Sequence, residues 1–283
     1  MGAALDVSQV SNCKVHFSLT DKKRIAVCFF GITRSLSHTI ESIRQNVLEP
    51  ARRCGEVRVF AHLFRQCQID NPRSGEIGEL DPYEYRMLEA DHVEHEEPSL
   101  CLDAMGFGNQ LLRPDPWTDG YKSLANLFHQ LHSLGRVFAF ASDWKPNVYI
   151  FARPDLRYLD SLEPHLVQAL AVRAEKIFYP NWQHHGGMND RFALVTGHQA
   201  ALVYSNRGRL ISEFRDELGG TFNGERLLKY AILTSNIEVE PMYVRAERVR
   251  SNGKRREESF RRPRSALNKT SLLYYLRFKN NRT

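Results

Sequence analysis

Apolar residues in this chain form short unbroken runs that alternate with segments of helical period. The first run, Ile25–Phe30, holds no charge and is rich in β-branched and aromatic side chains, which is typical of a strand covered on both faces. After Gly31, the apolar positions of a helix predicted to end near Arg53 share one face: Leu36, Ile40, Ile43 and Val47. A second apolar run follows at Val57–Phe64. Strand, helix and strand at this spacing predict a βαβ unit with parallel strands.

The rest of the chain continues this alternation after one interruption. Residues 66–119 contain five prolines and four glycines, which predicts long loops around one short helix near Tyr83–Ala90. The clearest helix is Tyr121–Ala141. Further strands are predicted at 147–152, 176–179, 192–196 and 238–244, and further helices at 162–171, 198–205 and 225–233. The pattern predicts an α/β fold in which a mostly parallel central sheet is flanked by helices, over residues 23–250 and after a lead-in at 1–22.

The composition is that of a soluble globular protein, because 42% of the 283 residues are apolar and 25% are charged. No apolar run has the length of a membrane span, and the first residues lack the features of a secretory signal, so we expect a cytoplasmic protein. The five cysteines show no paired spacing. They are expected to be reduced thiols rather than a disulfide framework or a zinc site.

Positive charge is concentrated at the C-terminus. Residues 245–283 hold thirteen lysines and arginines and three glutamates, a net charge of +10, whereas the whole chain carries +6. Residues 251–283 are predicted to form a basic tail with a short amphipathic helix around 267–276. Such a tail suits a peripheral membrane contact, although a helix packed onto the body of the protein fits the same pattern. No nucleic-acid-binding motif accompanies the charge, so we expect no nucleic-acid partner.

Polar residues with candidate chemistry follow the predicted strands, at the edge where open parallel sheets bind ligands. After the first strand, Gly31 lets the backbone approach an anion, and Arg34 can contact a phosphate with two hydrogen bonds. A plain turn between strand and helix explains these residues equally well. The strand at 147–152 delivers Asp155 to the same edge, between Arg153 and Arg157. Asp155 suits a divalent cation on a diphosphate, and a salt bridge with arginine is the alternative.

A third polar group, Asn189-Asp190-Arg191, precedes a later strand. Asp190 is placed for general-base work on a hydroxyl group and Asn189 for contact with a sugar hydroxyl, although such pairs are also common in turns. The stretch 91–96 and the helical histidines at 129 and 132 contain metal-ligand residue types. We expect them to be solvated surface rather than ligands, because acidic runs and surface histidines are common without a metal.

The order of these motifs resembles a known family. A strand ending in Gly-x-x-Arg is followed by one ending in Arg-Pro-Asp-Leu, then by Asn-Asp-Arg-Phe-Ala leading into Gly-x-x-x-Ala-Leu-x-Tyr, and later by a helix opening with Gly-Glu-Arg-Leu-Leu. This succession, over roughly residues 24–250, resembles the small bacterial and viral GT-A-like glycosyltransferases of capsule and lipopolysaccharide gene clusters. The resemblance implies a single GT-A-like, Rossmann-type catalytic domain that moves a sugar from a UDP- or GDP-sugar donor to a hydroxyl of a glycan or lipid-linked acceptor.

The resemblance also implies site residues. The catalytic base would be Asp190, with Glu225 as the reserve. The nucleotide-sugar site would comprise Phe30, Gly31, Ile32, Thr33, Arg34, Arg153, Arg157, Asn189 and Arg191. Asp155 matches one position of the Asp-x-Asp motif that holds Mn²⁺ or Mg²⁺ in the GT-A fold, but arginines stand two residues before and after it, so neutralisation of the diphosphate by arginines is the alternative. A sulfotransferase-like enzyme and a non-catalytic nucleotide- or glycan-binding protein are the alternative functions.

Overall fold

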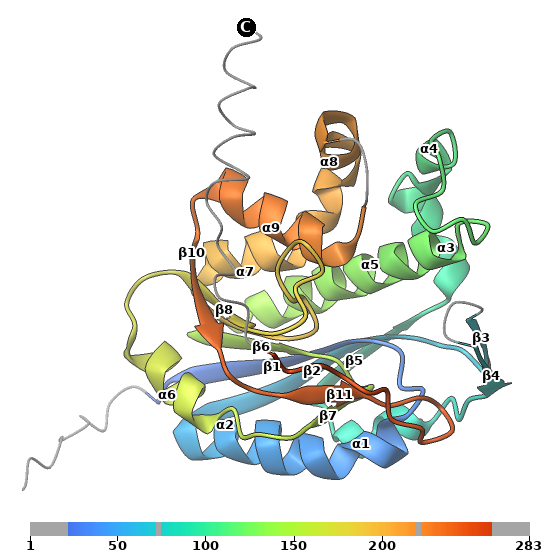
Figure 1. Cartoon of the computed structure of the whole chain (residues 1–283). Coiled ribbons are helices and arrows are strands. Elements are labelled where there is room, and N and C mark those ends of the chain that lie inside the picture. Colours follow the sequence, from blue (N-terminus) through green and yellow to red (C-terminus); the bar gives the residue numbers. More distant parts are fainter. Residues whose placement is uncertain (1–21, 72–74, 219–221, 262–283) are drawn as a thin grey trace, which may run out of the picture.

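A seven-stranded β-sheet forms the centre of the protein. The computed structural model describes residues 22–71, 75–218 and 222–261. The strands lie in the order β10-β8-β9-β6-β1-β2-β5, and in this sheet only β9 runs antiparallel to its neighbours (Figure 1). The sheet strands are β1 (Arg24–Gly31), β2 (Glu56–Phe64), β5 (His92–Glu96), β6 (Val148–Ala152), β8 (Lys176–Pro180), β9 (Ala193–Thr196) and β10 (Glu238–Met242). Two antiparallel pairs lie outside it: β3 (Gln68–Asn71) with β4 (Glu76–Glu79), and β7 (Leu156–Tyr158) with β11 (Ala246–Arg248).

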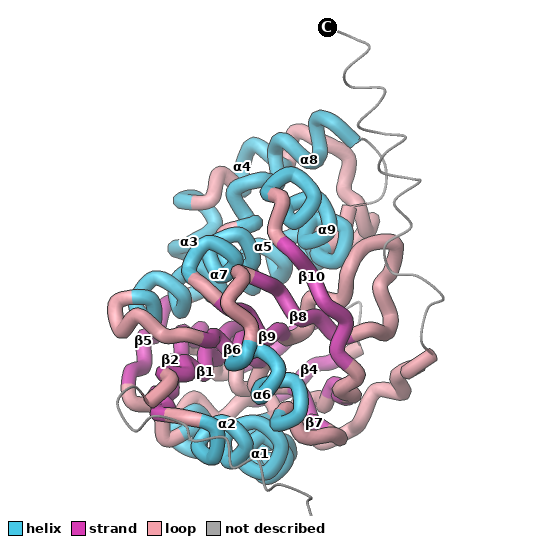
Figure 2. The backbone as a smooth tube through the Cα atoms, turned by 90° about the vertical axis from the view of Figure 1, so that its left-hand side faces the viewer, coloured by secondary structure: helices cyan, strands magenta, loops and turns pink. Residues whose placement is uncertain are grey.

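Helices cover both faces of the sheet. One face carries α1, α2 and α6, and the other carries α5, α7 and α9, with α3, α4 and α8 beyond them (Figures 1 and 2). The helices are α1 (Leu36–Ile43), α2 (Glu49–Cys54), α3 (Pro98–Ala104), α4 (Phe107–Gln110), α5 (Lys122–Ser142), α6 (Glu163–Ala171), α7 (His198–Ser205), α8 (Ile211–Leu218) and α9 (Gly224–Ser235). A π-helical stretch, Arg44–Leu48, joins α1 to α2, so the first helix ends close to the predicted residue.

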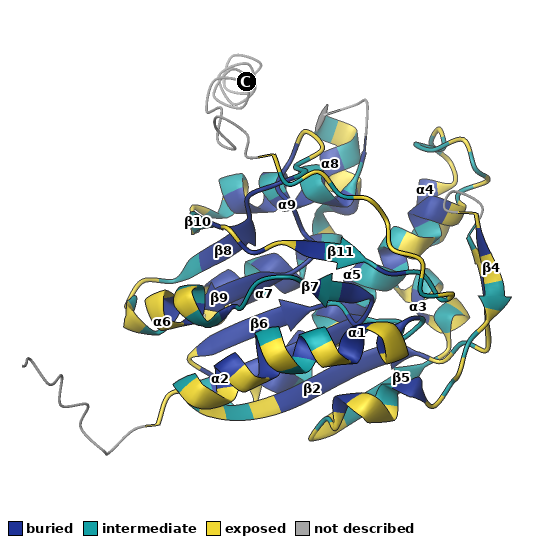
Figure 3. Ribbon diagram, turned by 60° about the horizontal axis from the view of Figure 1, so that its bottom comes forward, coloured by how far each residue is buried: buried dark blue, intermediate teal, exposed yellow. Residues whose placement is uncertain are grey.

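The two faces of β1 belong to two different hydrophobic cores. Ile25, Val27 and Phe29 pack with the core under α1, whereas the residues between them pack with the core under α5 and α7. Successive side chains of a strand point to opposite faces, so an unbroken apolar run buries both of them. The central strands are accordingly buried along most of their length (Figure 3).

The predicted fold class is confirmed: an α/β domain with a mostly parallel central sheet flanked by helices. The main differences lie in residues 66–119, which contain the β3–β4 hairpin, strand β5 and two short helices rather than loops alone. The short helix predicted near Tyr83–Ala90 is a 3₁₀ turn, Glu84–Leu88. None of the described helices is both long and apolar enough to cross a membrane.

The first part of the predicted tail packs on the domain. Strand β11 pairs with β7, and residues 249–261 continue from it along the body. The ring of Phe260 meets the buried ring of Trp182 edge-on, with centroids 5.0 Å apart. The amphipathic helix predicted around 267–276 lies outside the described residues.

Candidate active site

A cleft opens where β1 and β6 end. Its volume is about 560 Å³, which lies within the range of sites that bind small molecules. The end of β1, strand β3, one face of α5, the start of α9 and the segment after β11 all contribute to its walls. Segments far apart in the sequence therefore meet at the edge where α/β sheets commonly bind ligands.

The turn after β1 places the guanidinium group of Arg34, whose side chain is 9% exposed, in the cleft wall. Gly31 has a φ angle of 105°, which side chains other than glycine rarely tolerate, and its amide donates to Ser133 Oγ at 2.8 Å. Arg34 donates from Nη2 to Asp155 Oδ2 at 2.6 Å and from Nη1 to Glu76 Oε2 at 3.0 Å. Its Nε is buried without a protein hydrogen-bond partner. Arg34 is thus held by two acids, and its buried Nε–H has no protein partner.

Asp155 is bound by two arginines. Arg153 donates from Nε to Oδ1 at 2.9 Å and from Nη2 to Oδ2 at 2.7 Å, which is the bidentate geometry of a strong ion pair, and Arg34 adds a third bond. Burial alone would raise the pKa of Asp155, but the guanidinium groups of Arg153 and Arg34 hold this pKa well below its usual range. Both oxygens are taken by cationic donors, so the residues present here do not fit a divalent cation.

The first turn of α1 offers little to an anion. The amide of Ser37 donates to Glu84 Oε1 at 2.6 Å, so a carboxylate of the same chain already occupies this helix end. Three of the residues predicted to bind the donor, Phe30, Gly31 and Ile32, line the cleft, but Thr33 does not. Anion recognition after β1 would therefore rest on Arg34 rather than on the helix N-terminus.

Two carboxylates, Asp190 and Glu225, line the same cleft. Asp190 Oδ2 accepts a hydrogen bond from Nη2 of the fully buried Arg207 at 3.0 Å. Glu225 stands at the start of α9, after Gly224, where a Cβ atom would come within 2.6 Å of Asp190 Oδ2. Glycine at this position is what lets the helix bring its acid beside Asp190. Burial and the charge of Asp190 raise the pKa of Glu225 to about 7.

Glu258, from the predicted tail, joins two arginines of the cleft. Its Oε1 accepts from Arg248 Nε at 2.8 Å, and its Oε2 lies 3.4 Å from Arg191 Nη2. The guanidinium of Arg191 lies 4.7 Å from the centroid of the Trp182 ring, and its Nη1 is buried without a protein hydrogen-bond partner. Burial, more than the neighbouring charges, lowers the pKa of Arg191 to about 10.

Glu76, from the β3–β4 hairpin, makes a similar bridge. Its Oε2 accepts from Arg34 and from Arg250 Nη1, the latter at 3.1 Å, and its Oε1 accepts from the amide of Ser251 at 2.8 Å. Arg248, Arg250 and Arg256 all line the cleft. Sequence reasoning found the basic character of this segment but missed that its side chains enter the site, because no local pattern connects it to β1.

Besides Thr33, two of the predicted site residues lie outside the cleft lining. Arg157 is on β7, does not line the cleft, and lies 3.6 Å from Glu247 on β11. Asn189 is buried, and its side-chain amide donates to the carbonyl of Trp182 at 2.7 Å, which shapes the loop before Asp190. Nine residues of the predicted set therefore line the cleft: Phe30, Gly31, Ile32, Arg34, Arg153, Asp155, Asp190, Arg191 and Glu225.

Fold and cleft together define an α/β protein with a cleft lined by several arginines and by four carboxylates, Asp70, Asp155, Asp190 and Glu225. No protein-family model matches the chain, and no curated protein does. Among solved structures it is similar to the apo form of mouse xyloside xylosyltransferase 1, with a TM-score of 0.41 and 10% identity over 78% of this chain and 85% of that one. It is also similar to a protein assigned as a glucose-1-phosphate thymidylyltransferase from Bacillus anthracis, in complex with a sucrose. The TM-score is 0.37 and the identity 7%, over 80% of this chain and 89% of that one. Both scores are low, so the activities of these proteins are not carried over.

Proposed function

We propose that this chain transfers a sugar from a nucleotide-sugar donor to a hydroxyl group of a glycan or glycoconjugate acceptor. The observation that carries the proposal is the make-up of one cleft, in which several arginines share the walls with the pair Asp190 and Glu225. Guanidinium groups bind phosphate oxygens well, and a carboxylate of raised pKa can accept a proton from a hydroxyl. A nucleotide-sugar-dependent transferase brings these two kinds of group together.

The arginines would stabilise the leaving nucleoside diphosphate. Arg34 and Arg191 each present a buried N–H donor that has no protein partner, and each is fixed in place by an acid from another segment. Donors that are already oriented stabilise developing negative charge without a cost of reorganisation at the moment of reaction. Because the groups around Asp155 do not fit a divalent cation, no step of this reaction is assigned to a metal.

Glu225 is the better candidate for the base. Its pKa of about 7 leaves a substantial ionised fraction at neutral pH and matches the range in which general bases are most effective. The Asp190 carboxylate is engaged by Arg207, and its charge is one of the causes that raise the pKa of Glu225. We therefore exchange the roles inferred from the sequence: Glu225 acts as the base and Asp190 positions and tunes it.

In the proposed reaction the acceptor hydroxyl gives its proton to the Glu225 carboxylate. The acceptor oxygen forms a bond to the anomeric carbon of the donor sugar, while the bond from that carbon to the diphosphate breaks. The electron pair of this bond leaves with the diphosphate, whose charge the arginines stabilise. The donor class proposed is a UDP- or GDP-sugar and the acceptor a surface glycan or lipid-linked precursor, on the strength of the motif resemblance alone.

Ligand binding by the full chain tests the proposal. A ligand at one hundred times its Kd stabilises the native state by about 2.7 kcal/mol, so a thermal-shift screen of UDP, GDP and their sugars should register a donor. The variant Arg256→Gln, in the cleft wall, should weaken the binding of the diphosphate. Its matched control, Arg255→Gln, changes an exposed neighbour that does not line the cleft.

Transfer to hydroxyl acceptors, followed by product mass, then separates the alternatives. Diphosphate binding with neither transfer nor hydrolysis would identify the non-catalytic binding protein. Preference for a sulfonucleotide over UDP and GDP would identify a sulfotransferase-like enzyme. A protein that binds none of these ligands, or binds them equally well after Arg256→Gln, contradicts the proposed site.

A further inference from the structure

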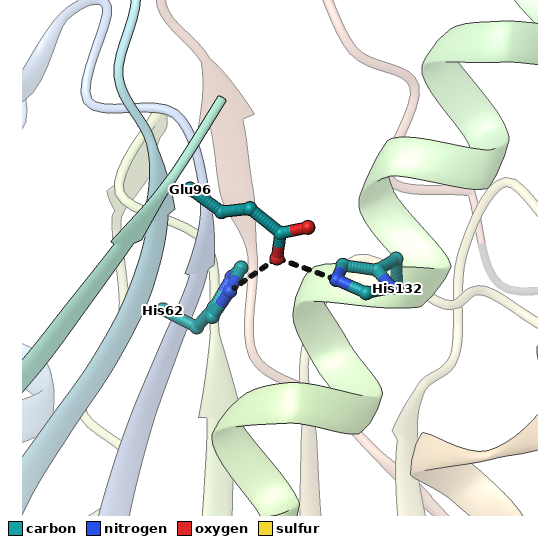
Figure 4. Close-up of side chains that lie close together, drawn as sticks. All are labelled: His62, Glu96 and His132. Carbon is teal, nitrogen blue, oxygen red and sulfur yellow. Dashed lines mark hydrogen bonds and ion pairs between the residues drawn. The ribbon is translucent and has the colours of Figure 1, made fainter. Parts of the chain in front are cut away.

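His62, Glu96 and His132 form a compact cluster next to the cleft, and each comes from a different element: β2, β5 and α5 (Figure 4). Glu96 Oε2 lies 3.2 Å from His62 Nε2 and 2.7 Å from His132 Nε2. All three ligand atoms lie within 4.8 Å of one another. Two imidazole nitrogens and a carboxylate oxygen that converge on one point are a set of ligands that zinc accepts.

The hydrogen bonds of Ser133 determine which nitrogen of His62 carries a proton. Ser133 Oγ donates its only hydrogen to the carbonyl of His62 at 2.6 Å and accepts from the amide of Gly31 at 2.8 Å. His62 Nδ1 lies 3.0 Å from the same oxygen, so Nδ1 must be the donor in this contact. This assignment follows from the donor and acceptor inventory of the hydroxyl group.

In a neutral His62 the other nitrogen, Nε2, then carries a lone pair that points at the carboxylate. Two acceptors would face each other at 3.2 Å beside the buried His62 ring, which is unfavourable unless a cation lies between them. In a tetrahedral site with metal–ligand bonds of about 2.0 Å, ligand atoms are about 3.3 Å apart, close to the separation of His62 Nε2 and Glu96 Oε2. We propose that His62, Glu96 and His132 bind a divalent transition-metal ion of the zinc type.

The surroundings of the cluster have the features of a metal site. The contact from His62 Nδ1 to Ser133 is the outer-sphere hydrogen bond that orients a ligating histidine. The side chains of Glu96 and His132 are 22% and 16% exposed, whereas that of His62 is buried, so the cluster is open on one side to an ion and to a further ligand such as water. His129, one turn earlier on α5, is not a candidate ligand, because its Nε2 is bonded to the carbonyl of Pro98 at 2.8 Å.

The bound ion would support the cleft rather than take part in transfer. It would tie the edge strand β5 and helix α5 to β2, and Ser133 connects His62 to the amide of Gly31 in the cleft wall. An edge strand such as β5 is hydrogen-bonded on one side only, so a metal bridge to α5 would hold it where the sheet does not. The inference does not depend on the proposed function, since none of the three ligands lines the cleft.

Metal binding by the untagged full chain tests the inference. After treatment with a chelator and its removal, Co²⁺ should bind at one equivalent and give the strong visible absorption of a tetrahedral site, and Zn²⁺ should displace it and raise the melting temperature. Glu96→Gln and His132→Gln should each weaken Co²⁺ binding at least tenfold. The control, His129→Gln, should bind Co²⁺ like the wild type, because it removes a histidine of the same helix that is already engaged.

The wild type alone can overturn the inference. If it binds no stoichiometric Co²⁺ and Zn²⁺ does not shift its melting temperature, the cluster is a hydrogen-bonded network with a proton on His62, and no metal site exists. Equal Co²⁺ binding by the wild type and His132→Gln would overturn it as well, because the ion would then sit elsewhere. Should Glu96→Gln fail to fold, the partly exposed His132→Gln and the wild-type titration still decide the question.

Discussion

Replacement of Glu225 by glutamine should stabilise the fold above pH 7 and leave it nearly unchanged at pH 4.5. Burial and the charge of Asp190 raise the pKa of Glu225 from 4.5 to about 7, so the native state binds this proton more tightly than the unfolded chain does. The wild type therefore loses stability as pH rises from 4.5 through 7. Each tenfold change in proton affinity is about 1.4 kcal/mol, so the loss approaches about 3 kcal/mol. Because a glutamine does not ionise, the variant avoids this loss of stability.

Urea unfolding between pH 4.5 and pH 8 measures this difference. The gain in stability of Glu225→Gln over the wild type should grow through this range and level off above pH 7. The control is Glu257→Gln, which neutralises an exposed glutamate outside the cleft and should change stability by the same small amount at every pH. If Glu225 is also the base, the glutamine variant should lose transfer activity by roughly a hundredfold to ten-thousandfold despite its greater stability.

A stability difference that stays constant from pH 4.5 to pH 8 would refute the reasoning, because Glu225 would then titrate alike in the native and unfolded states. Full transfer activity in a stabilised Glu225→Gln variant would be a separate result. It would mean that the pKa of Glu225 is raised as described, but that Glu225 is not the catalytic base. The two measurements therefore test the environment of this carboxylate and its catalytic role independently.

Three further predictions concern the ion pairs of the cleft. Asp155→Asn should destabilise the fold by roughly 3–5 kcal/mol near neutral pH, because the largely shielded Arg34 and Arg153 lose their buried partner. The deficit should shrink only below pH 3.8, as thermal unfolding at each pH would show. Arg34→Ala should lower the free energy of unfolding in urea by about 3 kcal/mol, whereas Arg52→Ala, at an exposed arginine, should lower it little. Equal losses in the two variants would contradict the assignment of Arg34 to a shielded ion pair. A chain ending at residue 250 should lose both diphosphate binding and transfer to soluble acceptors, whereas a chain ending at residue 261 should keep both. If the chain ending at residue 261 has lost a salt-sensitive binding to liposomes that the full chain shows, the membrane contact lies in residues 262–283.

The central elements could be predicted because burial on both faces leaves a strong local signal. β1 is an unbroken apolar run, and α5 carries an apolar stripe of helical period, so both were found close to their observed bounds. β5 was missed because His92–Glu96 is polar apart from Val93. It is an edge strand, and edge strands commonly carry charges that oppose pairing with another chain. Local composition alone therefore predicted a loop where tertiary pairing makes a strand.

The site was predictable only as far as it depends on strand ends. Arg34 and Asp155 were found because each follows a buried strand, but their direct bond joins residues 121 positions apart. A single sequence does not show that residues at two such strand ends form an ion pair with each other. For this reason Arg34 was interpreted only as a phosphate contact or as part of a turn, whereas its side chain is held between two acids. The sequence did not predict the cluster of His62, Glu96 and His132 for the same reason, because its members lie on three different elements.

Four arginines of the cleft, Arg34, Arg191, Arg248 and Arg250, are held in position by glutamates of the chain itself. Glu76 bridges Arg34 to Arg250, and Glu258 bridges Arg191 to Arg248, so each glutamate links a guanidinium near the sheet edge to one from β11 or the segment that follows it. Without these acids the like charges would repel one another in a partly buried space. With them, the like charges are compensated, and Arg34 and Arg191 keep buried N–H donors that have no protein partner. The segment after β11 is therefore part of the wall that would hold the diphosphate, and a ligand drawn to these donors would also fix the hairpin and this segment against the sheet.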